Sequence, residues 1–186
     1  MKKLAALMIT LVVLTGCTGK RAEMDRAMNL RATLLGSEGC SFTAHIAADY
    51  GDAIQEFSLY CGGTNEGNLG FRVEQPESIS GITGRFRGDK GELTFDDVVL
   101  TFPLLADGQV TPVSGPWILL KTLLGGYLTA CTVEEELLRL TIHDSYEEDA
   151  LQMEIWLSEE NLPVQAEILY GGRRILTMGV ENFQIR

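Results

Sequence analysis

Histidine and metal-ligand patterns are nearly missing from this chain. Only 2 histidines occur among its 186 residues, His45 and His143, and no C-x-x-C pair or histidine-rich stretch accompanies them. Zinc sites are usually built from such patterns, so we expect none. His143 is followed by Asp144 and Ser145, the residue types of a catalytic triad, but consecutive residues cannot adopt the geometry of base, acid and nucleophile. We therefore predict a turn there and no enzymatic activity.

The sequence also lacks the loops that hold cations and phosphates. The acidic run Glu147–Asp149 has neither a turn glycine nor the carboxylate spacing of a calcium loop. The glycine-rich segment Gly62–Asn68 lacks the Lys-Ser or Lys-Thr pair of a phosphate-binding loop. We predict that the protein contains no metal and no cofactor.

Positive charge is scarce as well. The chain has 15 Lys and Arg residues against 26 Asp and Glu residues, and its formal net charge is −11. A chain this acidic is not expected to bind nucleic acid or to be held electrostatically on anionic lipid. After the N-terminus, no apolar run is long enough to span a bilayer: the segment from Trp117 to Leu128 is interrupted by Lys121 and Gly125-Gly126.

The N-terminus has the organisation of an export signal. Lys2-Lys3 precedes an apolar stretch from Leu4 to Leu14, which is followed by Leu14-Thr15-Gly16-Cys17. This tetrad resembles the lipobox of bacterial lipoproteins, in which the cysteine receives diacylglycerol and the signal peptide is cut before it. The alternative is an ordinary cleaved signal with a chance cysteine.

The lipobox divides the chain into three parts. We predict a signal peptide over residues 1–16, a lipidated Cys17 with a short tether over 17–20, and one domain over 21–186. Removal of the signal peptide, which contains two lysines, changes the net charge from −11 to −13. Membrane attachment then depends on the acyl chains, such as palmitate, because two chains anchor a protein stably. The predicted location is the extracytoplasmic face of the cell membrane.

Three cysteines follow the predicted lipidation site: Cys40, Cys61 and Cys131. Alternating apolar residues on both sides of Tyr50-Gly51 predict a β-hairpin, and matching its apolar faces sets the register. Cys40 then faces Cys61, Phe42 faces Leu59, and Ala44 faces Phe57. This register allows a Cys40–Cys61 disulfide, which export would permit; the alternative is two small buried hydrophobic residues.

The rest of the chain reads as one α+β domain. Apolar residues spaced by three and four between Met24 and Leu35 predict an amphipathic helix, and an apolar helix is predicted from Trp117 to Leu124. Short alternating segments bounded by turn residues predict an antiparallel sheet. Its strands are expected at Leu69–Glu74, Gly81–Arg87, Glu92–Phe95, Val98–Phe102, Tyr127–Val133, Leu137–His143, Leu151–Leu157, Val164–Tyr170, Arg174–Met178 and Val180–Ile185.

The C-terminal strands resemble those of the LolA/LolB-like family of outer-membrane lipoprotein carriers. The similar segments are Ile155-Trp156-Leu157, Leu162-Pro163-Val164-Gln165-Ala166-Glu167-Ile168 and Asn182-Phe183. The resemblance implies a half-open barrel, a strongly curved antiparallel sheet wrapped over two or more helices, with an apolar concavity that holds acyl chains in the carrier. One subgroup, the clostridial-type spore germination lipoproteins, instead partners a cell-wall amidase.

Two functions follow from the resemblance. The first is a membrane-anchored, non-enzymatic lipoprotein that binds an acyl-chain or lipid-like ligand in the concave face. The alternative is a protein-interaction lipoprotein, an accessory partner in cell-envelope or spore-cortex remodelling; a hydrolase is the weakest hypothesis. The candidate ligand residues, which alternatively only fill the core, are Phe42, Phe57, Leu59, Trp117, Leu120, Leu124, Met153, Ile155 and Ile168.

Overall fold

The computed structural model describes residues 21–49, 54–88, 90–95, 98–103, 105–106, 109–147 and 150–186. The predicted signal peptide over 1–16, the lipidation site Cys17 and the tether over 17–20 lie outside the described residues and stay predictions. Within the described part, one hydrophobic core contains buried residues from Ala27 to Phe183. Residues 18–186 therefore contain every residue of this core.

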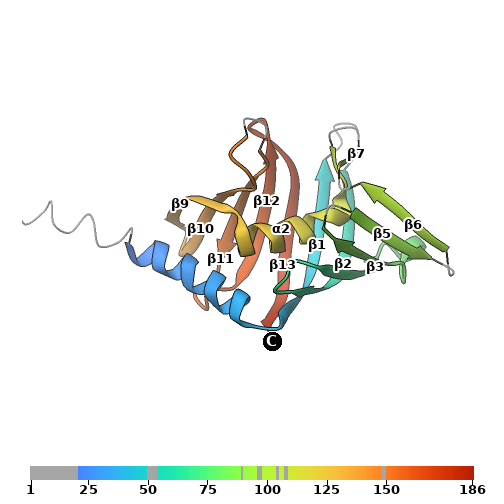
Figure 1. The fold of residues 1–186 in the computed structure, drawn as a ribbon. Coiled ribbons are helices and arrows are strands. Elements are labelled where there is room, and N and C mark those ends of the chain that lie inside the picture. Colours follow the sequence, from blue (N-terminus) through green and yellow to red (C-terminus); the bar gives the residue numbers. More distant parts are fainter. Residues whose placement is uncertain are drawn as a thin grey trace, which may run out of the picture.

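One long antiparallel sheet dominates the molecule (Figure 1). Its strands follow the order β6-β5-β4-β3-β2-β1-β13-β12-β11-β10-β9, so almost every strand pairs with its neighbour in the sequence and β1 pairs with β13. The bounds are β1 (Gly39–Asp49), β2 (Ile54–Thr64), β3 (Leu69–Gln75), β4 (Thr83–Arg87), β5 (Lys90–Phe95), β6 (Val98–Pro103), β9 (Tyr127–Glu134), β10 (Leu137–His143), β11 (Gln152–Leu157), β12 (Pro163–Tyr170) and β13 (Arg173–Ile185).

Several short elements lie between the strands of the sheet. The strands β7 (Leu105–Ala106) and β8 (Gln109–Val110) form a separate hairpin. The 3-10 helices η1 (Glu77–Ile79) and η2 (Pro112–Ser114) lie after β3 and before the second helix, α2 (Gly115–Gly125).

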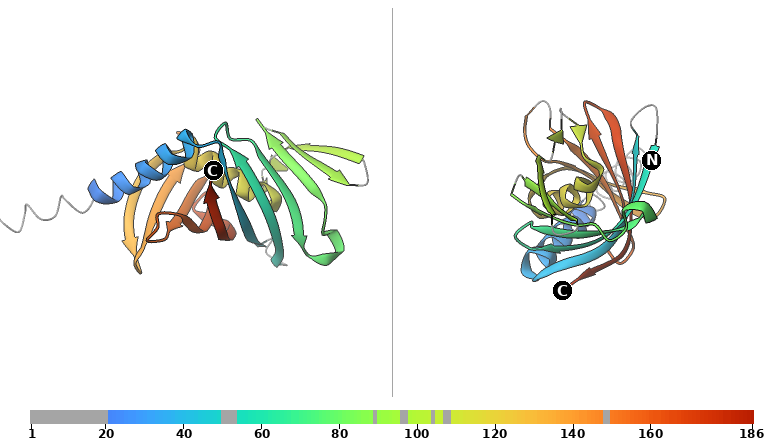
Figure 2. Two further views of the ribbon diagram at one scale, coloured as in Figure 1. Left: turned by 90° about the horizontal axis from the view of Figure 1, so that it is seen from below. Right: turned by 90° about the vertical axis from the view of Figure 1, so that its right-hand side faces the viewer.

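The sheet curves around two helices and does not close (Figure 2). The N-terminal helix, residues 21–36, lies along the end formed by β9 to β12, whereas the β5–β6 hairpin projects at the opposite end (Figures 1 and 2). The helix α2 runs across the concave face between them. The predicted fold class, an α+β half-open barrel with a strongly curved antiparallel sheet, is confirmed.

The helix α2 is buried on nearly all sides, which is unusual for a helix on a sheet. Trp117, Leu119, Leu120 and Leu123 are all buried, and of its long side chains Lys121 is exposed. Gly63 on β2 allows the close approach, because any side chain there would collide with Leu120 Cδ2. The helix therefore packs closely into the concave face of the sheet.

The first hairpin has a different register from the predicted one. Asp49 pairs with Ile54, so Cys40 faces Gly63 and Cys61 faces Phe42. The predicted two-residue turn was wrong, since four residues separate the strands. A shift of two residues leaves every side chain on its predicted face, which explains why the matching of apolar faces could not detect the error.

The cysteines are accordingly diagonal neighbours. Cα atoms at diagonal positions lie about 7–8 Å apart, beyond the range of about 4.4–6.8 Å in disulfides. Cys40, Cys61 and Cys131 are all free thiols, and the first two are buried. The disulfide that the predicted register allowed is thus not formed, and the alternative of two small buried hydrophobic residues fits Cys40 and Cys61.

We expect Cys40 and Cys61 to resist thiol reagents in the folded protein. Burial raises the pKa of Cys40 to about 11 and raises the pKa of Cys61 as well, so neither thiol forms the reactive thiolate at neutral pH. N-ethylmaleimide should modify only Cys131, which is partly exposed, and should modify all three after denaturation. Mass spectrometry of residues 18–186 measures this; an adduct on Cys40 or Cys61 without unfolding would contradict the burial.

Candidate functional site

Most of the sequence-predicted ligand residues belong to the core. Phe57 and Leu124 are partly buried, and the others are buried in one cluster of contacting apolar side chains. The structure places these side chains against one another in the core. Their role as a ligand wall therefore stays a prediction. The buried members are Phe42, Leu59, Trp117, Leu120, Met153, Ile155 and Ile168.

An apolar groove remains open beyond the end of α2, on the last strands of the sheet. Its volume is about 480 Å³, and we call it the edge groove, defined by its lining residues Ile82, Leu93, Phe95, Val98 and Leu100. Within the described part of the chain, every lining side chain is apolar. The volume falls within the range of about 300–1,000 Å³ that is usual for small-molecule sites.

Strand pairing places the edge groove on the core face of the sheet. Gly91 on β5 faces the buried Phe86 on β4, and alternate residues of a strand share a face. Leu93 and Phe95 therefore lie on the core side, as do their cross-strand partners Leu100 and Val98. The groove therefore continues the core face of the sheet, and its described lining residues all lie outside the helices.

The inner end of the edge groove adjoins an aromatic cluster. Phe86 stacks on Phe71 with ring centroids 5.5 Å apart and lies 5.9 Å from the ring of Trp117. Trp117 Nε1 donates a hydrogen bond to the carbonyl oxygen of Gly67, at 2.9 Å, which fixes the indole at the start of α2. The aromatic cluster thus joins β3 and β4 to the start of α2.

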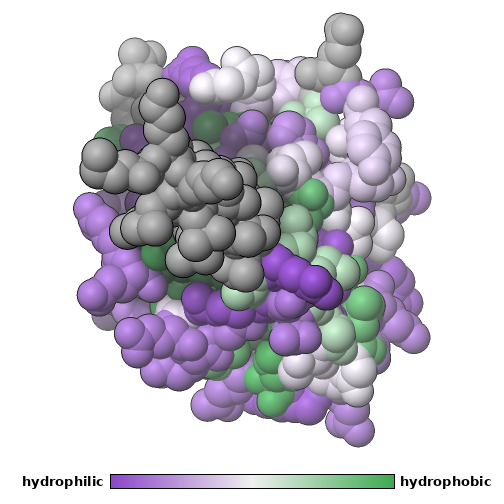
Figure 3. Space-filling model, turned by 90° about the vertical axis from the view of Figure 1, so that its left-hand side faces the viewer, coloured by the Kyte–Doolittle hydropathy of each residue, from purple (hydrophilic) through white to green (hydrophobic). Residues whose placement is uncertain are grey.

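The outer part of the edge groove is unusually exposed. Phe95, Val98 and Leu100 are 56%, 58% and 61% exposed, and Val99, which points to the other face, is 56% exposed. Contiguous exposed apolar residues of this kind commonly mark a ligand groove or an interaction surface. At the other end of the molecule, which bears the N-terminal helix, the hydrophobic residues form small separate groups on a mainly hydrophilic surface (Figure 3).

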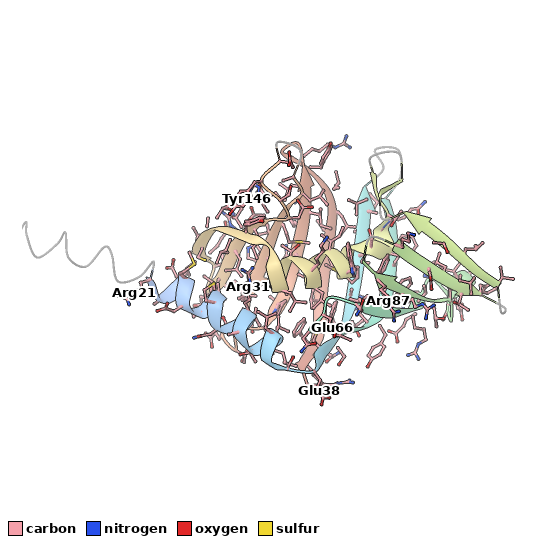
Figure 4. All side chains as sticks on the ribbon, in the orientation of Figure 1. Arg21, Arg31, Glu38, Glu66, Arg87 and Tyr146 are labelled. Atoms are coloured by element: carbon pink, nitrogen blue, oxygen red, sulfur yellow. The ribbon has the colours of Figure 1, made fainter. Side chains whose placement is uncertain are left out.

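An arginine joins the N-terminal helix to α2. The guanidinium of Arg31 donates hydrogen bonds to the carbonyl oxygens of Leu123, Gly126 and Thr122, at 2.7, 2.9 and 3.3 Å, and Figure 4 shows it between the two helices. The last turn of α2 carries no basic residue of its own, so Arg31 supplies the positive charge that favours a helix C-terminus. Burial lowers the pKa of Arg31. The sequence alone did not indicate this role.

A serine, a histidine and a glutamate meet on the outer face of the sheet. His45 Nδ1 lies 2.9 Å from Ser58 Oγ, and His45 Nε2 lies 3.4 Å from Glu181 Oε2. His45 and Ser58 border a cleft of about 440 Å³ that Phe57 also lines. Ser58 pairs with His45 on one side and with Gln75 on the other, so it lies within the sheet, between two strands. The contact is better explained as a cross-strand polar pair.

The part of the chain that the structure describes contains no cluster of three or more His, Cys, Asp or Glu side chains that could hold a metal ion. His143, Asp144 and Ser145 follow one another at the end of β10, where Asp144 Oδ1 accepts a hydrogen bond from the amide of Leu151. Among the described residues, no helix has both the length and the hydropathy that a membrane crossing requires.

Solved structures similar to this chain share little of its sequence. A LolA superfamily protein from Nitrosomonas europaea is 8% identical, with a TM-score of 0.48, over 86% of this chain and 93% of that one. An outer membrane lipoprotein-sorting protein domain from Vibrio parahaemolyticus is 8% identical, with a TM-score of 0.46, over 90% and 93%.

A third similar structure contains a lipoprotein with a protein partner. It is the CwlD amidase from Clostridioides difficile in complex with the GerS lipoprotein, and the match is 14% identical, with a TM-score of 0.42, over 86% of this chain and 93% of that one. No protein-family model and no curated protein matches this chain. At these identities the likeness is one of overall fold, and no ligand or partner is transferred by it.

Proposed function

We propose that this protein is a membrane-anchored, non-enzymatic lipoprotein that binds a hydrophobic, acyl-chain-like ligand in the edge groove. The observation that carries the proposal is the open volume of about 480 Å³, whose lining side chains among the described residues are all apolar. Each methylene group removed from water contributes roughly 0.8 kcal/mol, so a linear hydrocarbon chain suits such a surface. The ligand site is thus shifted from the centre of the concavity, where the sequence placed it, to the end of the sheet.

The proposed anchor is lipid on Cys17, at the extracytoplasmic face of the membrane. Only three residues, Thr18 to Lys20, separate Cys17 from Arg21, where the described helix begins, and each of the four Cα–Cα steps spans at most about 3.5 Å in an extended chain. The domain is therefore held within about 14 Å of its anchor. A protein tethered so closely is suited to receive or present a ligand at the membrane and not to carry it across an aqueous gap.

Substitutions on the two faces of one strand test the edge groove. Leu100→Glu places a carboxylate on the groove face, and Val99→Glu places the same group on the outer face of β6 at nearly equal exposure. Because a buried charge next to an acyl chain is costly, we expect Leu100→Glu to weaken binding of the fluorescent fatty acid parinaric acid at least about tenfold. Val99→Glu should retain the wild-type affinity.

Fluorescence titration of residues 18–186 and both variants measures the effect, and circular dichroism confirms that the variants are folded. Equal losses in the two variants, or saturable binding that neither substitution changes, would place the ligand outside the edge groove.

The alternative, a protein-interaction lipoprotein of the cell envelope, is supported by a different observation. The strand β6 ends the sheet and pairs with β5 on one side only among the described strands. Its sequence, Val98–Pro103, contains no charged residue. Such an edge is suited to pairing with a strand of another chain.

A further inference from the structure

The two edges of the sheet differ in how they are protected against pairing with another chain. Native edge strands are usually protected by charged side chains, prolines or bulges. The strand β9 ends in Glu134 and has a register irregularity opposite Thr141/Ile142 of β10. The strand β6 has neither: its pairing with β5 is regular throughout, it is uncharged, and its one proline is its last residue, Pro103.

The hairpin register identifies the backbone groups on the open side of β6. Phe95 and Val98 close the β5–β6 hairpin across two intervening residues. The closing pair of such a hairpin exchanges backbone hydrogen bonds, and bonded and non-bonded pairs alternate from there. The amides and carbonyls of Val99 and Thr101 therefore face away from β5, toward solvent.

We propose that the outer edge of β6 pairs antiparallel with β6 of a second copy of this chain. With the two-fold axis at Leu100, Val99 faces Thr101 of the second copy, and each exchanges its amide and carbonyl bonds with the other. Leu100 faces its own equivalent as a non-bonded pair. The strand is complementary to itself in this register, because every facing pair is uncharged and the outward backbone groups of the two strands meet.

Charge and shape agree with a second copy as the partner. The mature net charge of −13 makes approach of two copies unfavourable over most of their surface, but β6 contributes none of that charge. The N-terminal helix lies at the end of the molecule opposite to the β5–β6 hairpin (Figures 1 and 2). A dimer paired through β6 therefore has its two N-terminal helices at its outer ends, and a two-fold axis normal to the membrane directs both helices toward one bilayer. Tethering to one surface also raises the effective concentration of the copies.

This dimer is independent of ligand binding, because the pairing uses the backbone edge of β6 and the edge groove uses side chains on one face. Three variants separate the two. Thr101→Pro removes an outward amide while leaving the groove face intact, and proline is tolerated on edge strands. Leu100→Cys tests the two-fold register directly, and Thr94→Cys on β5, exposed but away from the edge, is its control. Both cysteine variants carry Cys131→Ser, so that only buried native thiols remain.

Analytical ultracentrifugation of residues 18–186 should show a mass that rises toward the dimer with protein concentration, and more strongly as salt screens the net charge. Thr101→Pro should be monomeric and should still bind parinaric acid. Under mild oxidation Leu100→Cys should form a disulfide-linked dimer, since facing non-bonded residues lie about 4.5 Å apart between Cα atoms, and Thr94→Cys should not. A monomer at every protein and salt concentration, or equal cross-linking of the two cysteine variants, would overturn the proposal. The edge of β6 would then be a candidate site for a different protein.

Discussion

Replacing Gly39 by alanine is expected to lower the free energy of unfolding by about 3 kcal/mol or more. Gly39 begins β1 with φ of +155°, and a Cβ atom there would collide with the carbonyl oxygen of Gly63 on β2. The backbone cannot move away easily, because Gly39 O accepts a hydrogen bond from the amide of Arg186 and the amide of Glu38 donates to Arg186 O. The close approach of β1 and β2 at this point lies in the central part of the sheet, where β1 also pairs with β13.

The matched control for Gly39 is Gly62→Ala. Gly62 lies on β2 in the same strand pair, its backbone conformation suits alanine, and no atom lies within 4 Å of the position a Cβ would take. We expect a change within about 0.5 kcal/mol. Urea unfolding of residues 18–186 followed by tryptophan fluorescence measures both variants. Similar free energies for the two would show that the strands do not approach as closely as described.

Replacing Arg31 by methionine is expected to cost about 2–3 kcal/mol. Methionine keeps much of the length and apolar stem but leaves the carbonyls of Thr122, Leu123 and Gly126 without their charged donor. It also removes the positive charge from the C-terminus of α2. Because Arg31 contacts α2 from the N-terminal helix, loss of these bonds should loosen both helices, and backbone amides near the end of α2 should exchange hydrogen faster.

Arg26→Met serves as the comparison for Arg31. Arg26 lies on the same helix, and its guanidinium donates one hydrogen bond, to the carbonyl oxygen of Ser158 at 2.9 Å. We expect a loss of about 1 kcal/mol, with no change in hydrogen exchange at α2. If both variants lost the same stability and left α2 equally protected, Arg31 would not be the link between the helices.

The overall fold was predictable because it depends on short-range patterns. Alternation of apolar residues defined the strands, and helical spacing defined the N-terminal helix and α2. The strand register and the continuity of one strand were not predicted correctly. The hairpin of β1 and β2 was predicted two residues out of register. Val180 was predicted to begin a new strand, although β13 is continuous from Arg173 to Ile185. Neither feature changes which side chains face the core, so hydrophobic patterns carry no information about them.

The candidate site was less accessible from the sequence. A buried apolar helix such as α2 suggests both a core and a ligand wall, and only the packing of Leu120 against Gly63 shows that the helix fills the concavity. The edge groove left a signal in the uncharged run Val98–Pro103, which has apolar residues on both faces. The pattern predicted a strand there, but its position at the end of the sheet depends on the pairing of all the strands before it.

Native mass spectrometry of residues 18–186, purified without detergent and then incubated with fatty acids and phospholipids, tests the central claim most directly. The proposed edge groove predicts added mass equal to one acyl-chain ligand, which disappears on denaturation and is strongly reduced in Leu100→Glu but not in Val99→Glu. A clean protein mass that no lipid changes would contradict a ligand-binding groove and would favour a protein partner at the membrane surface.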